Sequence, residues 1–134
     1  METRLQTIAR NCLDGAYANT MDFPEIVGTL MATGFEGYTV DYRRGTSIYY
    51  LADGDSIAFN NPPAEDHIAA GFDIPALQAA IRGAQTKAAG YTYKGFCNAV
   101  KAAGCAGYLV SFPGRRAVYF GRTAEVHVEH FPGT

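Results

Sequence analysis

The chain has 134 residues, a net charge of −2 and 48% hydrophobic residues. This length suits one domain with an ample core, and the lack of a basic surplus argues against a nucleic-acid-binding protein. No apolar run approaches the roughly 18 residues of a membrane span, and the amphipathic start lacks the apolar core of a signal peptide. We therefore expect a cytoplasmic protein with no membrane partner and no nucleic-acid partner.

Two amphipathic helices are predicted at the start of the chain. The first spans Thr3 to Tyr17, where apolar residues recur at steps of three and four. The second begins at Asp22, because an Asp followed three residues later by Glu25 is typical of a capping box. Gly34 is expected to end this helix, since glycine adopts the left-handed conformation of a helix C-terminus without a Cβ penalty.

Three short strands are predicted to follow as an antiparallel meander. They span Gly37 to Tyr42, Thr46 to Leu51 and Ser56 to Phe59. Asp53-Gly54 marks the second turn, because both positions tolerate positive φ. The run from Asn60 to Asp66 contains two prolines and predicts a loop between two halves of the chain.

The same order of elements is predicted again in the second half. Asp73 and Thr92 are expected to cap two further helices, the first with an apolar stripe that reaches Ala88. Gly104 takes the place that Gly34 has in the first half. The three strands expected after it span Gly107 to Phe112, Arg116 to Gly121 and Glu125 to His130.

A repeated sequence run links the two halves. The residues from Gly34 to Tyr42 return as the residues from Gly104 to Phe112, with glycine, tyrosine and valine at matching positions. We therefore predict an α+β fold, with a mainly antiparallel sheet and a duplicated helix–helix–three-strand unit as a pseudo-two-fold internal repeat. The chain is then a single domain of two halves, about 1–62 and 70–134, joined by a Pro/Asn-rich loop.

The match between the halves is expected to weaken at the third strand. The second turn of the first half looks one residue longer than its counterpart. On that alignment, Ile57 and Phe59 correspond to Val126 and Val128, with the register displaced by one residue.

The middle strands are apolar on both faces, at Ile48 to Leu51 and at Val118 to Phe120. A sheet with helices on one side and water on the other alternates apolar and polar residues instead. Two arrangements stay open. Either the two meanders pack on each other, or they join one sheet whose open face meets a partner chain or a ligand, and a homodimer is one such partner.

Two runs carry a resemblance to a known family. Tyr38-Thr39-Val40-Asp41-Tyr42-Arg43-Arg44-Gly45, and Thr92-Tyr93-Lys94-Gly95-Phe96-Cys97 before a tyrosine-rich hairpin, resemble the YbcV-like family of bacterial proteins. The resemblance covers most of the chain. It implies a small single-domain protein of unknown function, sometimes labelled phage envelope protein, with no known catalytic residues.

Four tyrosines recur at matching positions of the two halves and are candidate ligand-binding residues. They are Tyr38, Tyr49, Tyr108 and Tyr119. Tyrosine has an apolar ring and a polar tip, so the four side chains suit the walls of a small-molecule cleft at the junction of the halves. The alternative is packing in the core.

Asp41, Arg44 and His127 are the remaining candidate ligand-binding residues. Asp41 stands beside Arg43 and Arg44 and suits acid–base chemistry or anion binding, with a solvated hairpin tip as the alternative. His127 and Glu129 share a strand face, and His67 is a third residue that could complete a metal site. No zinc spacing is present, so we expect no metal and no cofactor, and a polar outward face on the last strand.

Composition and motifs together favour a non-enzymatic binding or interaction module. Cys12, Cys97 and Cys105 form no C-x-x-C pair and read as buried apolar residues. A winged helix is disfavoured, because neither expected recognition helix is basic. The alternative function is a small-molecule-binding protein or an enzyme with Asp41, Arg44 and His127 at the junction of the halves.

Overall fold

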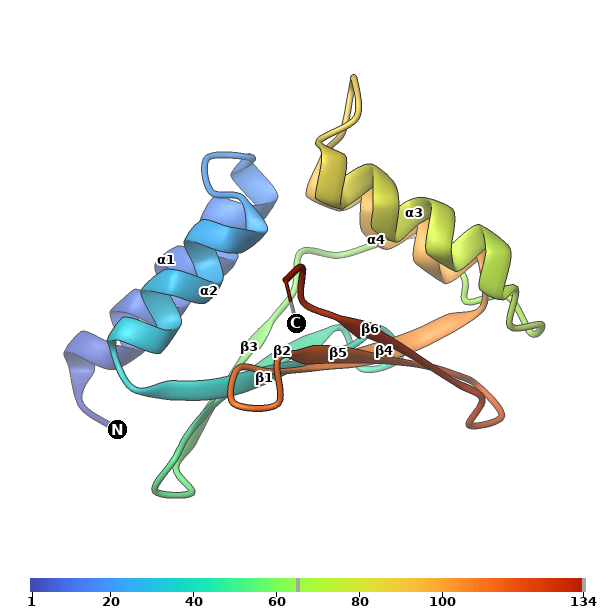
Figure 1. Ribbon diagram of the computed structural model, residues 1–134. Helices are drawn as coiled ribbons and strands as arrows, with labels where there is room; N and C mark the ends of the chain where they lie inside the picture. Colours follow the sequence, from blue (N-terminus) through green and yellow to red (C-terminus); the bar gives the residue numbers. More distant parts are fainter. Residues whose placement is uncertain (65, 134) are drawn as a thin grey trace.

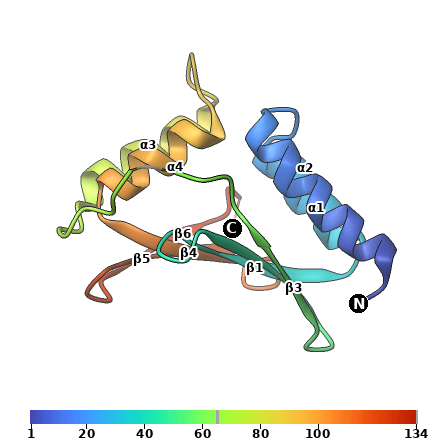
Figure 2. The same ribbon diagram turned by 180° about the vertical axis from the view of Figure 1, so that it is seen from behind.

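The computed structural model describes residues 1–64 and 66–133, and these form an α+β fold. Helices α1 (Thr3–Ala18), α2 (Phe23–Ala32), α3 (Ile74–Thr86) and α4 (Tyr93–Ala102) lie in two pairs over one face of a six-stranded sheet (Figures 1 and 2). The strands are β1 (Phe35–Asp41), β2 (Thr46–Leu51), β3 (Ser56–Asn60), β4 (Cys105–Ser111), β5 (Arg116–Gly121) and β6 (Val126–His130). Their order is β3-β2-β1-β4-β5-β6 with antiparallel neighbours, which confirms the predicted fold class.

The two meanders join through β1 and β4 into one sheet. Tyr38 lies opposite Val110, and Thr39 lies opposite Leu109. The arrangement in which the meanders pack on each other is therefore wrong. Edge-to-edge pairing satisfies the backbone donors and acceptors of β1 and β4, which face-to-face packing leaves exposed at two additional sheet edges.

Strands β3 and β6, the third strands of the two halves, correspond to each other without any displacement in register. The predicted displacement of one residue between them is therefore wrong. Elements α2 to β3 recur with their bounds shifted by 70 residues, as α2 at 23–32 and α4 at 93–102 illustrate. Thr46 lies opposite Asn60, and Arg116 lies opposite His130 in the same way. The two turns before β3 and β6 are thus equally long. An internal repeat in the sequence stays a prediction.

Several element boundaries differ from the predicted ones by one or two residues. Strands β1 and β4 begin at Phe35 and Cys105, before the predicted starts at Gly37 and Gly107, and the pairing register shifts between these positions. Helix α3 ends at Thr86, where Lys87 adopts a left-handed φ of 50°, so Ala88 lies outside its stripe. The capping box of Asp22 and Glu25 is confirmed.

The sheet has one covered face and one open face. Tyr38, Val40 and Tyr49 point under the helices and are buried. The opposite face carries Leu109, Val126 and Val128, which are 42%, 54% and 38% exposed. The prediction that the strands are apolar on both faces is confirmed, and the open face carries none of the described helices (Figure 1).

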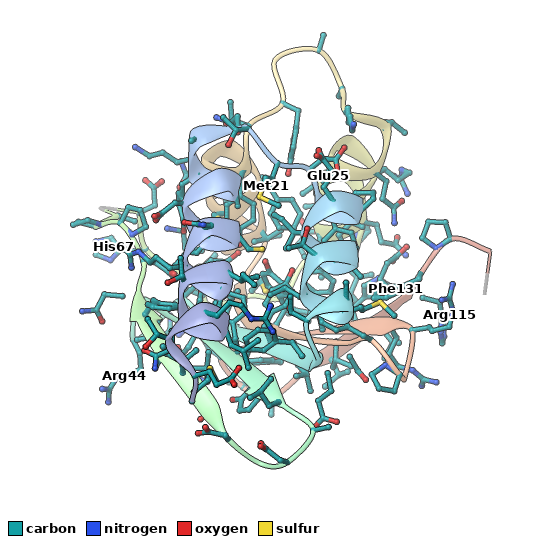
Figure 3. The ribbon with its side chains drawn as sticks, turned by 90° about the vertical axis from the view of Figure 1, so that its left-hand side faces the viewer. Met21, Glu25, Arg44, His67, Arg115 and Phe131 are labelled. Carbon is teal, nitrogen blue, oxygen red and sulfur yellow. The ribbon has the colours of Figure 1, made fainter. Side chains whose placement is uncertain are left out.

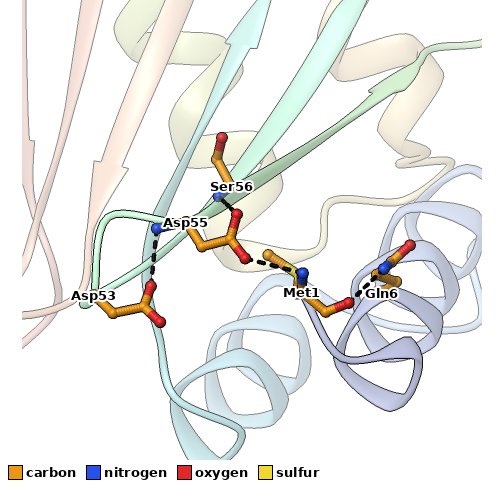
Figure 4. Close-up of polar contacts among 5 residues, drawn as sticks. All are labelled: Met1, Gln6, Asp53, Asp55 and Ser56. Carbon is orange, nitrogen blue, oxygen red and sulfur yellow. Dashed lines mark hydrogen bonds and ion pairs between the residues drawn. The ribbon is translucent and has the colours of Figure 1, made fainter.

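Met1 ties the start of α1 to the sheet. Its amino nitrogen lies 3.1 Å from Oδ2 of Asp55 in the β2–β3 turn, and its carbonyl accepts a 2.7 Å hydrogen bond from Gln6 (Figure 4). The same turn is held by Asp53, whose carboxylate accepts from the backbone N–H of Asp55. The first helix pair is therefore anchored to one end of the first meander.

The chain crosses from β3 to α3 over the second helix pair. The predicted loop from Asn60 to Asp66 falls partly on residue 65, outside the described residues. Beyond it, the N–H of Ala69 donates to the carbonyl of Lys101 at 3.0 Å, and that of Asp73 to Ala103 at 2.8 Å. In residues 1–64 and 66–133 no helix is long and apolar enough to cross a membrane.

Candidate functional site

A cleft of about 930 Å³ lies between the two helix pairs and has the middle of the sheet as its floor. Apolar side chains dominate its walls, including Val27 on α2 and Ile81 on α3. Its size falls within the range of small-molecule sites, about 300–1,000 Å³. We call it the tyrosine cleft, after the floor residues Tyr38, Tyr49, Tyr108 and Tyr119.

The four floor tyrosines form a continuous row of rings across four strands. Tyr49 and Tyr38 are directly opposite each other, with ring centroids 5.5 Å apart. Tyr108 and Tyr119 are paired likewise at 5.2 Å, and the Tyr38 and Tyr108 rings meet edge to face at 6.2 Å. The alternation of the strands places all four on one face, so both predicted roles, core packing and cleft lining, apply to them.

The floor hydroxyls are neutral hydrogen-bonding groups. Tyr108 and Tyr93 share a 2.7 Å hydrogen bond between their hydroxyls. Burial raises the pKa of all four floor tyrosines, and this desolvation outweighs the hydrogen bond from Tyr108 that lowers the pKa of Tyr38. At neutral pH the floor therefore presents aromatic surface and uncharged hydroxyls to a ligand.

Helix α4 supplies an aromatic wall that the sequence did not reveal as part of a site. Phe96 stacks on Tyr93 with centroids 6.0 Å apart and meets the edge of Tyr108 at 6.4 Å. The signal available in the sequence was the two aromatics three positions apart on one helix face.

Two contacts close the cleft at the helix loops. The Lys87 ammonium lies 2.5 Å from Oδ2 of Asp22, and the N–H of Tyr93 donates to the side-chain oxygen of Asn19 at 3.1 Å. Both join the α1–α2 loop to the connection between α3 and α4, where Lys87 follows α3 and Tyr93 begins α4. The tyrosine cleft is thus bridged at this end.

The chain that leaves β6 also borders the cleft. The Phe131 ring meets Phe23 of α2 edge to face at 5.8 Å and lies 5.8 Å from the Arg115 guanidinium. Figure 3 shows Phe131 and Arg115 beside α2. Glu129 and Arg115 also line the cleft, which therefore combines an apolar body with charged groups.

The three charged candidates do not meet in the tyrosine cleft. Asp41 accepts from the backbone N–H groups of Arg43 and Arg44 at 2.9 and 3.0 Å, which is a turn-stabilising role. Arg44 borders a different, smaller cavity, and Figure 3 places it on the far side of α1 from Arg115. His127 does not line either cavity and lies on β6, at one edge of the sheet.

His127 and Glu129 lie on the helix side of the sheet, so the predicted polar outward face is wrong. His127 is directly opposite Tyr119, and residues opposite each other share a face. Its Nε2 lies 3.1 Å from Oε2 of Glu129. Exposed His67 sits beyond α1 on the side of Arg44 (Figure 3), and no group of three metal-ligating residues occurs within residues 1–64 and 66–133.

The three cysteines are buried, as predicted. Burial raises the pKa of the Cys105 thiol to about 11 and also raises the pKa of Cys12 and Cys97. A thiol with a raised pKa carries little thiolate at neutral pH and is a poor nucleophile. The cysteines therefore add packing to the fold and no reactive centre to the cleft.

The fold and the cleft define the class of this protein as a small α+β protein with a tyrosine-floored cavity. No protein-family model matches the chain, and no curated protein matches it significantly. Membership of the YbcV-like family stays a prediction.

Replacing Lys87 with Ala is expected to lower the stability of the protein more at pH 7 than at pH 3. The hydrogen bond from Lys87 lowers the pKa of Asp22 below its ordinary 3.8, so the pair stabilises the fold above that pH. The contribution is lost as the pH falls through the lowered pKa. Urea unfolding at both pH values measures it.

Arg82→Ala is the matched control for this experiment. It removes a cation from the exposed surface of α3 without touching Asp22. Equal loss of stability in Lys87→Ala at pH 3 and pH 7 would contradict the bridge between the helix pairs.

Proposed function

We propose that this protein is a non-enzymatic binding module that holds a small, largely apolar molecule in the tyrosine cleft. The observation that carries the proposal is the row of four buried tyrosine rings under a cavity of about 930 Å³. Such a floor offers a flat aromatic surface with hydroxyls for orientation. A planar or ring-containing ligand is the chemistry that it fits best.

The chemistry of the lining supports binding over catalysis. The floor hydroxyls stay protonated at neutral pH, because burial raises their pKa. They can donate and accept hydrogen bonds but cannot act as bases there. The enzyme alternative drew on Asp41, Arg44 and His127, and neither cavity brings these three residues together.

The decisive experiment is a fluorescence titration with Nile red, an uncharged dye that brightens in apolar surroundings. The wild-type protein is expected to bind it, and Gly28→Trp to bind at least tenfold more weakly. Gly28 lines the cleft on α2 with nothing within 4 Å of a Cβ placed there, so the new ring extends into open space. Binding of the dye by Gly28→Trp at wild-type strength would refute the proposed site.

Native mass spectrometry of protein purified without added ligand identifies the natural occupant. An extra mass of a few hundred daltons is expected, and its composition gives the ligand class. The same spectrum tests for a homodimer, which stays one of the open alternatives and for which the apolar open face of the sheet around Leu109 is the support. The cytoplasmic location also stays a prediction.

A further inference from the structure

A second cavity, of about 400 Å³, shares no lining residue with the tyrosine cleft. It lies between the β1–β2 turn, the segment that follows β3, and a face of α4. This face repeats at steps of three and four residues, with Lys94, Asn98 and Lys101 on it. We call it the basic cavity, after its residues Tyr42, Arg44, Lys94 and Lys101.

Lys101 is a buried cation at the base of the basic cavity. Its residue is only 4% exposed, because the segment after β3 covers this end of α4. The ammonium lies 5.7 Å from the centroid of the Tyr42 ring and forms no ion pair with any residue in 1–64 or 66–133. A buried charge of this kind is costly without a counter-charge.

Tyr42 adds an unused donor at the same place. Its hydroxyl oxygen is buried and has no nitrogen or oxygen partner within the described chain, and the neighbouring thiol of Cys97 is only a weak acceptor. Native proteins pair nearly all buried polar atoms, so one that lacks a partner needs an explanation. Burial raises the pKa of Tyr42, which keeps the hydroxyl protonated and able to donate.

Positive charges outnumber negative charges among the described lining residues. Arg43, Arg44, Lys94 and Lys101 face a single carboxylate, Asp66, among the described lining residues. The side chains of Arg44 and Lys94 form no ion pair within residues 1–64 and 66–133. A small enclosed space with several cations concentrates anions.

The fold itself does not need these polar groups. The position on α2 that corresponds to Lys101 holds Met31, and the position after β4 that corresponds to Tyr42 holds Phe112. Lys94 corresponds to Pro24 in the same way. The other half of the molecule builds the same elements with apolar residues at these places, so the polar set in the basic cavity serves another purpose.

We infer that the basic cavity binds an oxyanion, the phosphate or carboxylate group of a small molecule. The Lys101 ammonium and the Tyr42 hydroxyl donate to the anion at the base, and Arg44 and Lys94 hold it at the mouth. A charged acceptor satisfies both buried groups at once. The inferred site differs from the apolar tyrosine cleft in chemistry and lining, so either can exist without the other.

The test compares the thermal unfolding midpoint of the protein in sodium phosphate with that in sodium chloride of equal ionic strength. A parallel measurement in sodium succinate tests for binding of a carboxylate. A ligand that binds only the folded state raises the midpoint, and we expect at least about 3 °C at saturation. A rise in phosphate alone assigns a phosphoryl group, and a rise in succinate alone assigns a carboxylate.

Two substitutions replace residues at the base of the basic cavity with the residues found at the corresponding positions of the other half of the molecule. Lys101→Met is expected to abolish the rise and to unfold no earlier than wild type in chloride, because it removes a buried unpaired charge. Tyr42→Phe is expected to weaken anion affinity about tenfold. Arg44→Gln changes only the exposed mouth and is expected to reduce the rise even if a variant at the base does not fold.

Lys87→Met is the matched control, since it removes the same charge far from the basic cavity, at the mouth of the tyrosine cleft. It is expected to keep the full rise. An equal rise in wild type and Lys101→Met, or no rise above chloride with either anion, would overturn the inference.

Discussion

Replacing Gly104 with Ala is expected to destabilise the protein by roughly 3–5 kcal/mol, a large part of the total of about 5–15 kcal/mol for a typical domain. Gly104 has a φ of +92°, which disfavours any residue with a Cβ. A Cβ at this position also lies 2.7 Å from the carbonyl carbon of Gly71 and 2.9 Å from Cα of Phe72. It lies even closer to the carbonyl oxygen of Gly71. Because these are backbone atoms, they cannot relieve the collision by rotating away as a flexible side chain can.

Gly34→Ala separates the two causes of this loss. Gly34 has a similar φ of +100°, but a Cβ there meets nothing within 4 Å. We expect it to cost only the conformational penalty, about 1–2 kcal/mol. Urea unfolding of both variants at neutral pH measures the difference, which is the cost of the collision with the segment after β3. Equal losses would show that this segment does not pack on Gly104 in solution.

Tyr119→Ala is expected to cost about 3–5 kcal/mol of stability and to weaken Nile red binding in the tyrosine cleft at least tenfold. Tyr119 is 6% exposed and stacks on Tyr108. Its removal leaves a hole in the row of rings that forms the floor. Tyr49→Ala is expected to act alike at the other end of the row, where Tyr49 is 3% exposed.

Conservative and matched variants keep this prediction testable if an Ala variant unfolds. Tyr119→Phe keeps the ring and is expected to retain the fold and most of the dye binding. Tyr50→Ala removes a tyrosine from the next position along β2, on the open face, where its hydroxyl bonds Thr39 at 3.1 Å. We expect it to cost about 1 kcal/mol and to leave the binding unchanged.

Dye binding in Tyr50→Ala and in folded Tyr119→Ala decides the matter. If Tyr50→Ala loses dye binding and folded Tyr119→Ala keeps it, the dye binds on the open face of the sheet and not in the tyrosine cleft. The proposed function would then fail, while the stability effects would stand.

The sequence predicted the local features of the fold well. The capping box of Asp22 and Glu25 and the turn at Gly54 are confirmed, because the hydrogen bonds and the positive φ involved arise within a few residues. The four tyrosines of the floor were also singled out from the sequence, because they recur at matching positions in the two halves. Their assembly into one row required β1 to pair with β4.

The charged candidates show where this reasoning stopped. Asp41 was correctly placed at a hairpin tip, where its carboxylate accepts hydrogen bonds from the backbone of the turn. His127 was placed on the wrong face, because one residue of register reverses every side chain of a strand. The turn before β6 is as long as the turn before β3, and only the pairing with β5 shows it.

The amino-acid sequence alone determined the helices, the strands, the α+β class and the apolar character of both strand faces, since each depends on periodicity and short-range hydrogen bonds. Tertiary structure alone decided that the two meanders share one sheet, that a cleft opens above the tyrosines, and that Lys101 is buried. Each of these depends on contacts between residues far apart in the chain. Lys101 is covered by the segment after β3, in which Ala69 bonds to it from 32 positions earlier in the chain, and no local pattern on α4 contains that information.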